Sequence, residues 1–170
     1  MCGINGVLSI NNIDNKTKKK FNSSLNCLKH RGPDQIGFFK KNNVLIGNTR
    51  LKINDLKDIE TPLIYKNRYV ISFNGELINF RELKKKFFQN ENFATRTDTE
   101  VVVAMYHKFK ENCLKYFNGM FSISIYDKKK NEIFLARDKF GIKPLYYNFK
   151  KKIFHFSSEL KSIRKFDKNL

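Results

Sequence analysis

The chain is poor in cysteine and in acidic residues, and it has no long apolar run. Its three cysteines, Cys2, Cys27 and Cys113, are an odd number without a Cys-x-x-Cys pair, which argues against a disulfide framework and a structural zinc site. No charged-then-apolar leader opens the sequence and no run of about 18 apolar residues occurs, so neither secretion nor membrane spanning is indicated. A reactive thiol suits a reducing compartment, and we expect a cytoplasmic protein.

The shortage of acidic residues leaves a strongly basic chain. Asp and Glu number 16 against 34 Lys and Arg, which gives a formal net charge of +18. A basic field attracts phosphate backbones whatever their sequence. The lysines, however, lie in short runs such as 18–20 and 84–86, spread along the chain. Solvated turns and helix faces explain such runs, so the charge predicts no specific nucleic-acid partner.

Large apolar side chains, by contrast, are plentiful. Hydrophobic residues make up 41% of the 170, with 17 Phe and 7 Tyr. A disordered chain would lack these groups, and a chain of this length buries about 70% of its unfolded surface on folding. We therefore expect one globular domain over residues 1–170.

Short β-rich runs separated by polar turns dominate the sequence. Three pairs of runs predict hairpins: 36–39 with 44–46, 63–65 with 69–73, and 145–147 with 153–156. Further strands are predicted at 4–10, 121–125 and 133–136. Helical spacing is found in four stretches: 16–29, two that follow Asn79 and Thr97, and 158–166. Many hairpins and few helices predict an α+β domain in which helices cover antiparallel sheets.

The two central helices carry start signals. Asn79 and Thr97 each precede a glutamate by three residues, at Glu82 and Glu100. In a capping box, the first residue and the glutamate each bind an N–H group that the helix leaves free. We therefore predict that these side chains cap the two helices.

Cys2 carries the most chemistry of any residue in the chain. Removal of Met1 would leave a thiol nucleophile and a free α-amine on one residue. The amine has an ordinary pKa of about 7.7–8.0 and the thiol one of about 8.5, so the amine can act as the base. Taken alone, however, position 2 could simply be an arbitrary small residue.

Three further positions could serve the same chemistry. Asn74-Gly75-Glu76 predicts a turn at a strand end, where an amide and a glycine N–H could bind an oxyanion; an ordinary Asn-Gly turn is the alternative. Arg50 could pair with a substrate carboxylate or be an exposed strand-end residue. Asp98 could stabilise a helix N-terminus or accept hydrogen bonds from an ammonium group.

Several motifs with a fixed order span nearly the whole chain: residues 1–4 (MCGI), 30–34 (HRGPD), 50–51 (RL), 74–76 (NGE), 97–101 (TDTEV), 119–121 (GMF), 136–147 (ARDKFGIKPLYY) and 157–161 (SSELK). Together they resemble the class II glutamine amidotransferase domain of the N-terminal-nucleophile hydrolases. Residues 31–34 and 141–147 resemble the glutamine-dependent asparagine synthetases more than the phosphoribosyl or hexosamine branches.

The resemblance implies a four-layer αββα sandwich of two antiparallel sheets between helical layers. It implies that Cys2 is the nucleophile and that Asn74 and Gly75 form the oxyanion hole. The resemblance implies that Arg50, Glu76 and Asp98 bind glutamine. The backbone around Leu51 to Ile53 would line the same pocket.

The sequence departs from the family pattern at four positions. Lys52 and Asn54 stand where relatives usually have Ser and Asp, and Ser122 and Ser124 replace small or aromatic residues. These departures affect fine substrate geometry rather than the nucleophile. No histidine is needed in this scheme, and we expect His30 to help position its loop.

The resemblance also implies a reaction. L-Glutamine would be hydrolysed to glutamate and ammonia through a thioester on Cys2, without a metal or an organic cofactor in this domain. ATP and magnesium would serve a C-terminal synthetase domain that converts aspartate to asparagine and lies outside this chain, because the sequence has no Gly-rich phosphate loop of that type. A homodimer is an option, and no membrane partner is expected. Two alternatives stay open: delivery of ammonia to a sugar or another carboxylate, and an inactive regulatory or interaction domain.

Overall fold

The chain folds into two facing β-sheets between two pairs of helices, as a computed structural model that describes residues 1–53 and 59–167 shows. The first sheet has the strand order β2-β3-β1-β9-β8 and the second has the order β4-β5-β6-β7. Adjacent strands are antiparallel throughout both sheets. The strand bounds are β1 Gly3–Ser9, β2 Gln35–Lys41, β3 Val44–Arg50, β4 Leu63–Tyr65, β5 Tyr69–Leu77, β6 Gly119–Asp127, β7 Glu132–Arg137, β8 Tyr146–Lys150 and β9 Ile153–Ser157.

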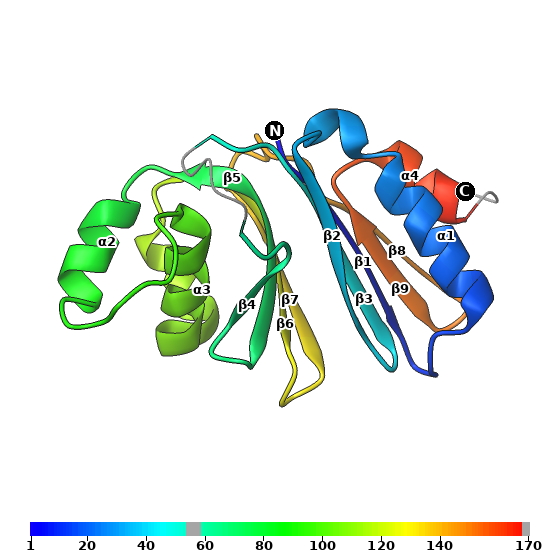
Figure 1. Cartoon of the computed structure of the whole chain (residues 1–170), viewed down its shortest axis with the longest axis horizontal. Coiled ribbons are helices and arrows are strands. Elements are labelled where there is room, and N and C mark those ends of the chain that lie inside the picture. The colour runs from blue at the N-terminus through cyan, green and yellow to red at the C-terminus, as the bar shows by residue number, and fades with distance from the viewer. Residues whose placement is uncertain (54–58, 168–170) are drawn as a thin grey trace.

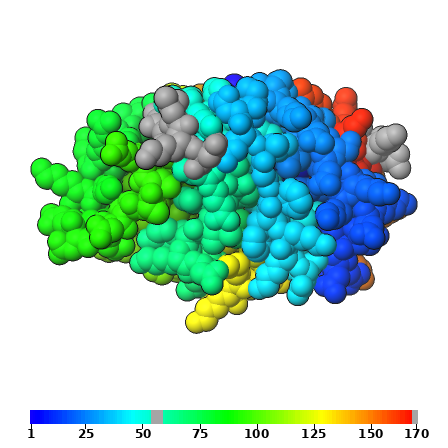
Figure 2. Space-filling view, viewed as in Figure 1, coloured from blue at the N-terminus to red at the C-terminus, as the bar shows by residue number. Residues whose placement is uncertain are grey.

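The helices form the two outer layers. They are α1 Asn15–Asn26, α2 Phe80–Phe87, α3 Asp98–Phe109 and α4 Leu160–Phe166, with short 3₁₀ helices at Lys29–Arg31 and Lys110–Tyr116. Figure 1 shows α1 and α4 on the outer side of the first sheet and α2 and α3 beyond the second. The αββα architecture predicted from the sequence is therefore confirmed. In Figure 2 the blue and cyan segments of the first sheet and the green segments of the second meet in one elongated body.

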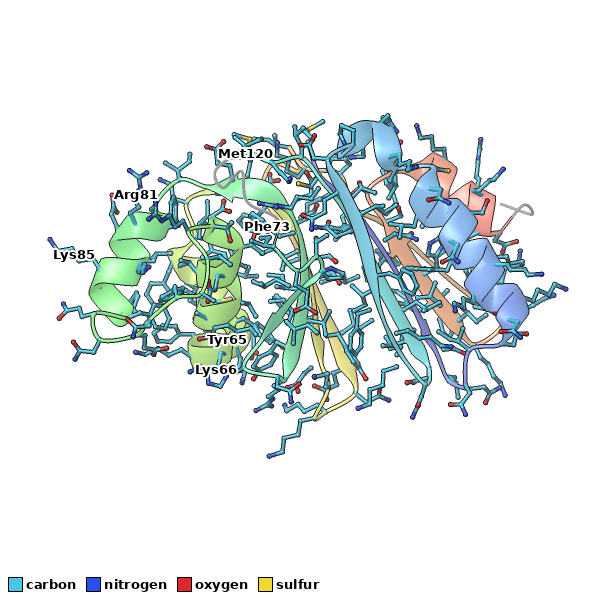
Figure 3. All side chains as sticks on the ribbon, viewed as in Figure 1. Tyr65, Lys66, Phe73, Arg81, Lys85 and Met120 are labelled. Carbon is cyan, nitrogen blue, oxygen red and sulfur yellow. The ribbon has the colours of Figure 1, made fainter. Side chains whose placement is uncertain are left out.

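Strand alternation divides the core into layers. On β3, Val44 and Ile46 join Val70 and Tyr126 in the cluster between the sheets. Leu45, which points to the other face, packs with residues of α1. The second sheet and α3 share the largest cluster, which is rich in aromatic and β-branched side chains. Figure 3 shows side chains filling all three inter-layer spaces, while Arg81 and Lys85 of α2 point outward.

The predicted capping boxes are wrong, although both helices begin where expected. The side chain of Thr97 makes no capping hydrogen bond to α3. The Glu100 carboxylate instead accepts the backbone N–H groups of Ala94 and Thr95, at 2.9 and 2.6 Å, and so ties down the loop before the helix. Asn79 likewise makes no capping bond to α2, and its Nδ2 donates to the Tyr116 carbonyl at 2.9 Å. Tertiary partners outcompete the local caps in both cases.

The predicted turn at 74–76 is also wrong, because β5 continues through these residues to Leu77. Each of them pairs with a residue of β6, from Asn74 opposite Ser122 to Glu76 opposite Met120. Among the described residues, no helix is long and apolar enough to cross a membrane.

Candidate active site

A cleft that is partly open to solvent is hollowed into one end of the sandwich. The N-terminus lies at this end, between the two sheets (Figure 1), and Phe73, labelled in Figure 3, lines the cleft from β5. The structure brings every predicted site residue to this cleft, while their roles stay predictions: Cys2, Arg50, Leu51, Ile53, Asn74, Gly75, Glu76 and Asp98.

The two sheets deliver these residues because of their alternation. On β3, Asn48 shares its face with Val44 and Ile46, which lie in the cluster between the sheets. Ile4 of β1 lies opposite Asn48, so Cys2, two residues before Ile4, points to this same inner face. On β5, Asn74 shares its face with Val70, which belongs to the cluster between the sheets. The Cys2 thiol and the Asn74 amide thus approach each other from facing sheets.

The Cys2 thiol lies against the backbone of Leu51. The Leu51 N–H donates to Sγ at 3.4 Å, and Sγ lies 3.8 Å from the Leu51 carbonyl oxygen. Burial raises the pKa of the Cys2 thiol, and the Leu51 N–H, the positive chain terminus and Arg50 partly oppose that shift. A raised pKa keeps the thiol protonated at neutral pH, so this thiol would need a base close by in order to act as a nucleophile.

The main chain at Cys2 is held by Arg31, a residue of the 30–34 motif for which the sequence predicted no role. Its Nε donates to the Cys2 carbonyl at 2.9 Å, and its Nη1 pairs with Glu159 Oε1 at 2.9 Å. Glu159 also accepts from Lys161 Nζ and lies 2.9 Å from His30 Nε2, so His30 does brace this loop. Partial burial would raise the pKa of Glu159, but hydrogen bonds from Arg31, Lys161 and His30 lower it to about 2.

Asn74 and Gly75 present two donors to the cleft. Asn74 is 1% exposed, and its Nδ2 has only a long 3.5 Å contact to Ser122 Oγ. The Leu77 N–H points away from β6, to Asp98, and alternation turns the Gly75 N–H to the same edge of β5. Strand β4 reaches only to the position opposite Ile71, so it does not cover that edge at Gly75.

Packing against β6 requires a glycine at position 75, whether or not a ligand binds there. A Cβ built there would lie 2.4 Å from the Met120 carbonyl oxygen and 2.7 Å from the Phe121 Cα. Both neighbours are backbone atoms of β6, which cannot move aside without breaking the ladder. A side chain at position 75 would therefore displace the strand that carries Asn74.

Charged groups of both signs line the cleft, among them the carboxylates of Glu76 and Asp98 and the guanidinium of Arg50. Asp98, 5% exposed at the start of α3, accepts the Leu77 N–H at 3.0 Å. Burial raises its pKa, hydrogen bonds from the Leu77 and Thr99 N–H groups lower it, and the Glu76 charge raises it. Arg50, 7% exposed at the end of β3, donates to Gln35 Oε1 at 3.0 Å. This layout is complementary to an α-amino acid, which carries one ammonium and one carboxylate group.

The loop that follows Arg50 forms one rim of the cleft. Leu51 is half-buried and Ile53 is 69% exposed at the rim. Lys52, one of the departures from the family pattern, donates its N–H to Asp34 Oδ2 at 2.8 Å. Asn54, another departure, lies outside the described residues.

Sequence reasoning missed several residues of the cleft, among them the polar residues Asn48 and Lys143. Asn48 is 6% exposed, and its Oδ1 has no hydrogen-bond partner although its Nδ2 donates to Thr61. Lys143 comes from a loop in which the Asp138 carboxylate accepts the N–H groups of Phe140, Ile142 and Lys143. Asn48 carries no local signal, because its partner Thr61 is 13 residues away. Lys143 lies within the 136–147 motif, which by itself gives it no role.

The remaining thiols and histidines lie away from this chemistry. Cys113 is buried, and burial raises its pKa to about 12. Cys27 caps the C-terminus of α1. Among the cleft-lining residues that the structure describes, none is a histidine.

Comparison with known proteins decides the family. Residues 1–169 match the family described as the glutamine amidotransferase domain. The chain belongs to this family. The predicted family and enzyme class are thereby confirmed.

Individual relatives point to one branch. This amidotransferase domain is 37% identical to asparagine synthetase [glutamine-hydrolyzing] 1 and 34% identical to asparagine synthetase [glutamine-hydrolyzing] 3 of Bacillus subtilis, in each case over 96% of the chain. It is 40% identical to a Methanocaldococcus jannaschii protein over the same share. The chain spans only 26%, 27% and 35% of those three relatives, respectively.

A solved structure supports the fold. Glutamine phosphoribosylpyrophosphate amidotransferase from Bacillus subtilis superposes on 97% of this amidotransferase domain and 43% of its own chain with a TM-score of 0.81. At 20% sequence identity, that likeness concerns the fold alone.

Proposed function

We propose that this domain hydrolyses L-glutamine to glutamate and ammonia, and that the ammonia serves asparagine synthesis by an ATP-dependent synthetase domain. The observation that carries the hydrolysis is the convergence, in one cleft, of a residue-2 thiol, two oxyanion donors and charges complementary to an α-amino acid. The relatives named as glutamine-hydrolysing asparagine synthetases support the acceptor.

The first chemical step needs Met1 to be removed. While Met1 is attached, the Cys2 nitrogen is an amide and cannot take a proton. Once free, the α-amine accepts the thiol proton as Sγ attacks the carboxamide carbon of glutamine. The oxygen becomes an anion that Asn74 Nδ2 and the Gly75 N–H stabilise.

Collapse of this intermediate breaks the carbon–nitrogen bond. The protonated α-amine returns its proton to the departing nitrogen, which leaves as ammonia, and a γ-glutamyl thioester remains on Cys2. Water then attacks the thioester with the amine again as base, and glutamate leaves as the thiol re-forms. Arg50 binds the substrate carboxylate and Glu76 and Asp98 its ammonium group, so recognition is separate from the reacting bond.

The Arg31–Glu159 pair keeps the nucleophile in place during these steps. Its hydrogen bond to the Cys2 carbonyl fixes the main chain on which both the thiol and the amine depend. Because burial makes the thiol a weak acid, a misplaced amine could not deprotonate it.

A direct assay tests the two halves of this proposal. The 170-residue chain is incubated with glutamine, aspartate, ATP and magnesium, and glutamate and asparagine are measured in parallel. Glutamate without asparagine is expected. No glutamate would refute the glutaminase, and asparagine made by this chain alone would refute the assignment of the second reaction to another domain.

A further inference from the structure

Strand β8 extends the first sheet beyond the cover of the second. Tyr147 and Phe149 lie opposite Phe156 and Phe154 of β9, so all four rings share one face. Phe156 is fully buried on that face, against Gly6 in the middle of the sheet. Tyr147 and Phe149, one strand further out, remain 72% and 65% exposed.

These exposed rings continue the buried core to the surface. The Tyr147 and Phe154 ring centroids are 5.8 Å apart, and those of Phe154 and Phe156 are 6.1 Å apart. We call Tyr147, Phe149 and Phe154 the β8 patch. The patch belongs to the inner face of the first sheet, at a strand that the second sheet does not cover. Adjacent exposed rings of this kind mark interaction surfaces.

The patch lies on the inner face of β8, between the cleft near the start of this strand and the turn to β9 at its end. Lys143, which lines the cleft, is three residues before the first residue of β8. Asp167, just after α4, forms an ion pair of 3.0 Å with Lys150 at the other end of β8. Alternation turns Lys150 to the outer face of the sheet, on which α4 packs. A domain attached after α4 would therefore start on that outer face and reach the patch around the edge of β8, the last strand of the first sheet in the described residues.

We propose that the β8 patch is the docking surface of the ATP-dependent synthetase domain, an inference that rests on the proposed function. The relatives are about three to four times as long as this chain, which leaves ample polypeptide to cover the patch. The turn at the end of β8 carries Lys151 and Lys152, so the partner surface should be acidic around an apolar centre. A second copy fits less well, because two chains of net charge +18 repel each other.

The first test maps solvent access to the patch. Residues 1–170 replace the matched segment of the Bacillus subtilis asparagine synthetase 1, and hydroxyl-radical labelling of this fusion is compared with that of the 170-residue chain. Labelling at Tyr147 and Phe149 should fall in the fusion, whereas Phe38 on β2, the opposite edge strand, should label equally in both. Equal labelling of the patch would overturn the proposal, and so would protection that appears in the 170-residue chain as its concentration rises.

The second test measures transfer of ammonia in the fusion. The double variant Tyr147→Ser/Phe149→Ser should release glutamate at the parent rate and make asparagine from added ammonia at the parent rate. Asparagine formed per glutamate from glutamine should fall at least about tenfold, since two interface anchors are lost.

The matched control is Ile36→Ser/Phe38→Ser on β2, which should leave this ratio unchanged. An unchanged ratio in the β8 variant, or an equal fall in the control, would overturn the docking surface. Absence of glutamate release from the unsubstituted fusion would instead count against the proposed function, so the two failures are distinguishable.

Discussion

At the scale of single residues, recognition and reaction are assigned to different side chains. In the proposed reaction, Arg50 binds the substrate carboxylate, whereas Asn74 binds the charge that develops on the reacting oxygen. Interactions made only in the transition state change kcat, and interactions made equally with bound substrate change KM. The two residues should therefore separate in steady-state kinetics.

We predict that Asn74→Ala lowers kcat by about 10²–10³-fold, because one oxyanion donor is lost. Arg50→Lys should mainly raise the KM for glutamine, because a point charge replaces a planar guanidinium. Glutamate release measured over a range of glutamine concentrations tests both. A change in KM alone for Asn74→Ala would show that its amide does not bind the oxyanion.

The unpartnered Oδ1 of Asn48 gives a second residue-scale prediction. A buried acceptor such as Asn48 Oδ1 needs a hydrogen-bond donor, which can come from water or from a bound substrate. The carboxamide N–H groups of glutamine are such donors. Asn48→Leu should therefore weaken glutamine more than it weakens the product glutamate as a competitive inhibitor. Measured KM for glutamine and Ki for glutamate give the comparison, and an equal change in both would remove Asn48 from substrate selection.

At the scale of elements, long-range pairing decided the points that local sequence did not. Alternation and turn chemistry were sufficient to predict the hairpins and the order of strands and helices. Asn74-Gly75 has the composition of a turn, but pairing with β6 keeps it extended. The capping box predicted at Thr97 does not form, because the Glu100 carboxylate accepts hydrogen bonds from the backbone of the preceding loop instead. The motifs of the family resemblance pointed to the cleft, whereas the link from Glu159 through Arg31 to Cys2 joins residues too distant for any local pattern.

Strand β9 carries a buried titratable group. His155 is 1% exposed beneath α4, and its Nε2 lies 2.9 Å from Asn5 Oδ1. Burial lowers its pKa to about 3, a shift that the charge of Asp167 only partly opposes. The unfolded chain binds a proton at this residue below about pH 6.5, and the folded chain does so only near pH 3.

The stability contributed by neutral His155 is therefore complete above about pH 6.5 and is lost as the pH falls toward 3. At pH 5 the loss is about 2 kcal/mol of unfolding free energy. Urea unfolding at pH 7.5 and pH 5 should show this difference in the parent and a smaller one in His155→Gln. Equal differences in the two proteins would mean that another group is responsible.

At the scale of the whole molecule, the charge of +18 is expected to act as a diffuse field rather than as a binding site. Binding to a random DNA duplex should be weak, without sequence preference, and should collapse between about 50 and 200 mM salt as counterions are released. Fluorescence anisotropy over this range is the measurement. Tight binding that survives 200 mM salt or depends on sequence would contradict the assignment of the lysines to solvated turns and helix faces.

The account depends most on Cys2 as a terminal nucleophile, and one mass measurement tests it directly. Protein mixed with glutamine and quenched in acid is analysed intact and by peptide mapping, beside Cys2→Ala. We predict that the protein lacks Met1, that a γ-glutamyl group is found on the residue-2 peptide, and that Cys2→Ala carries no adduct and releases no glutamate. Glutamate release by Cys2→Ala, or full activity of protein that retains Met1, would contradict the mechanism.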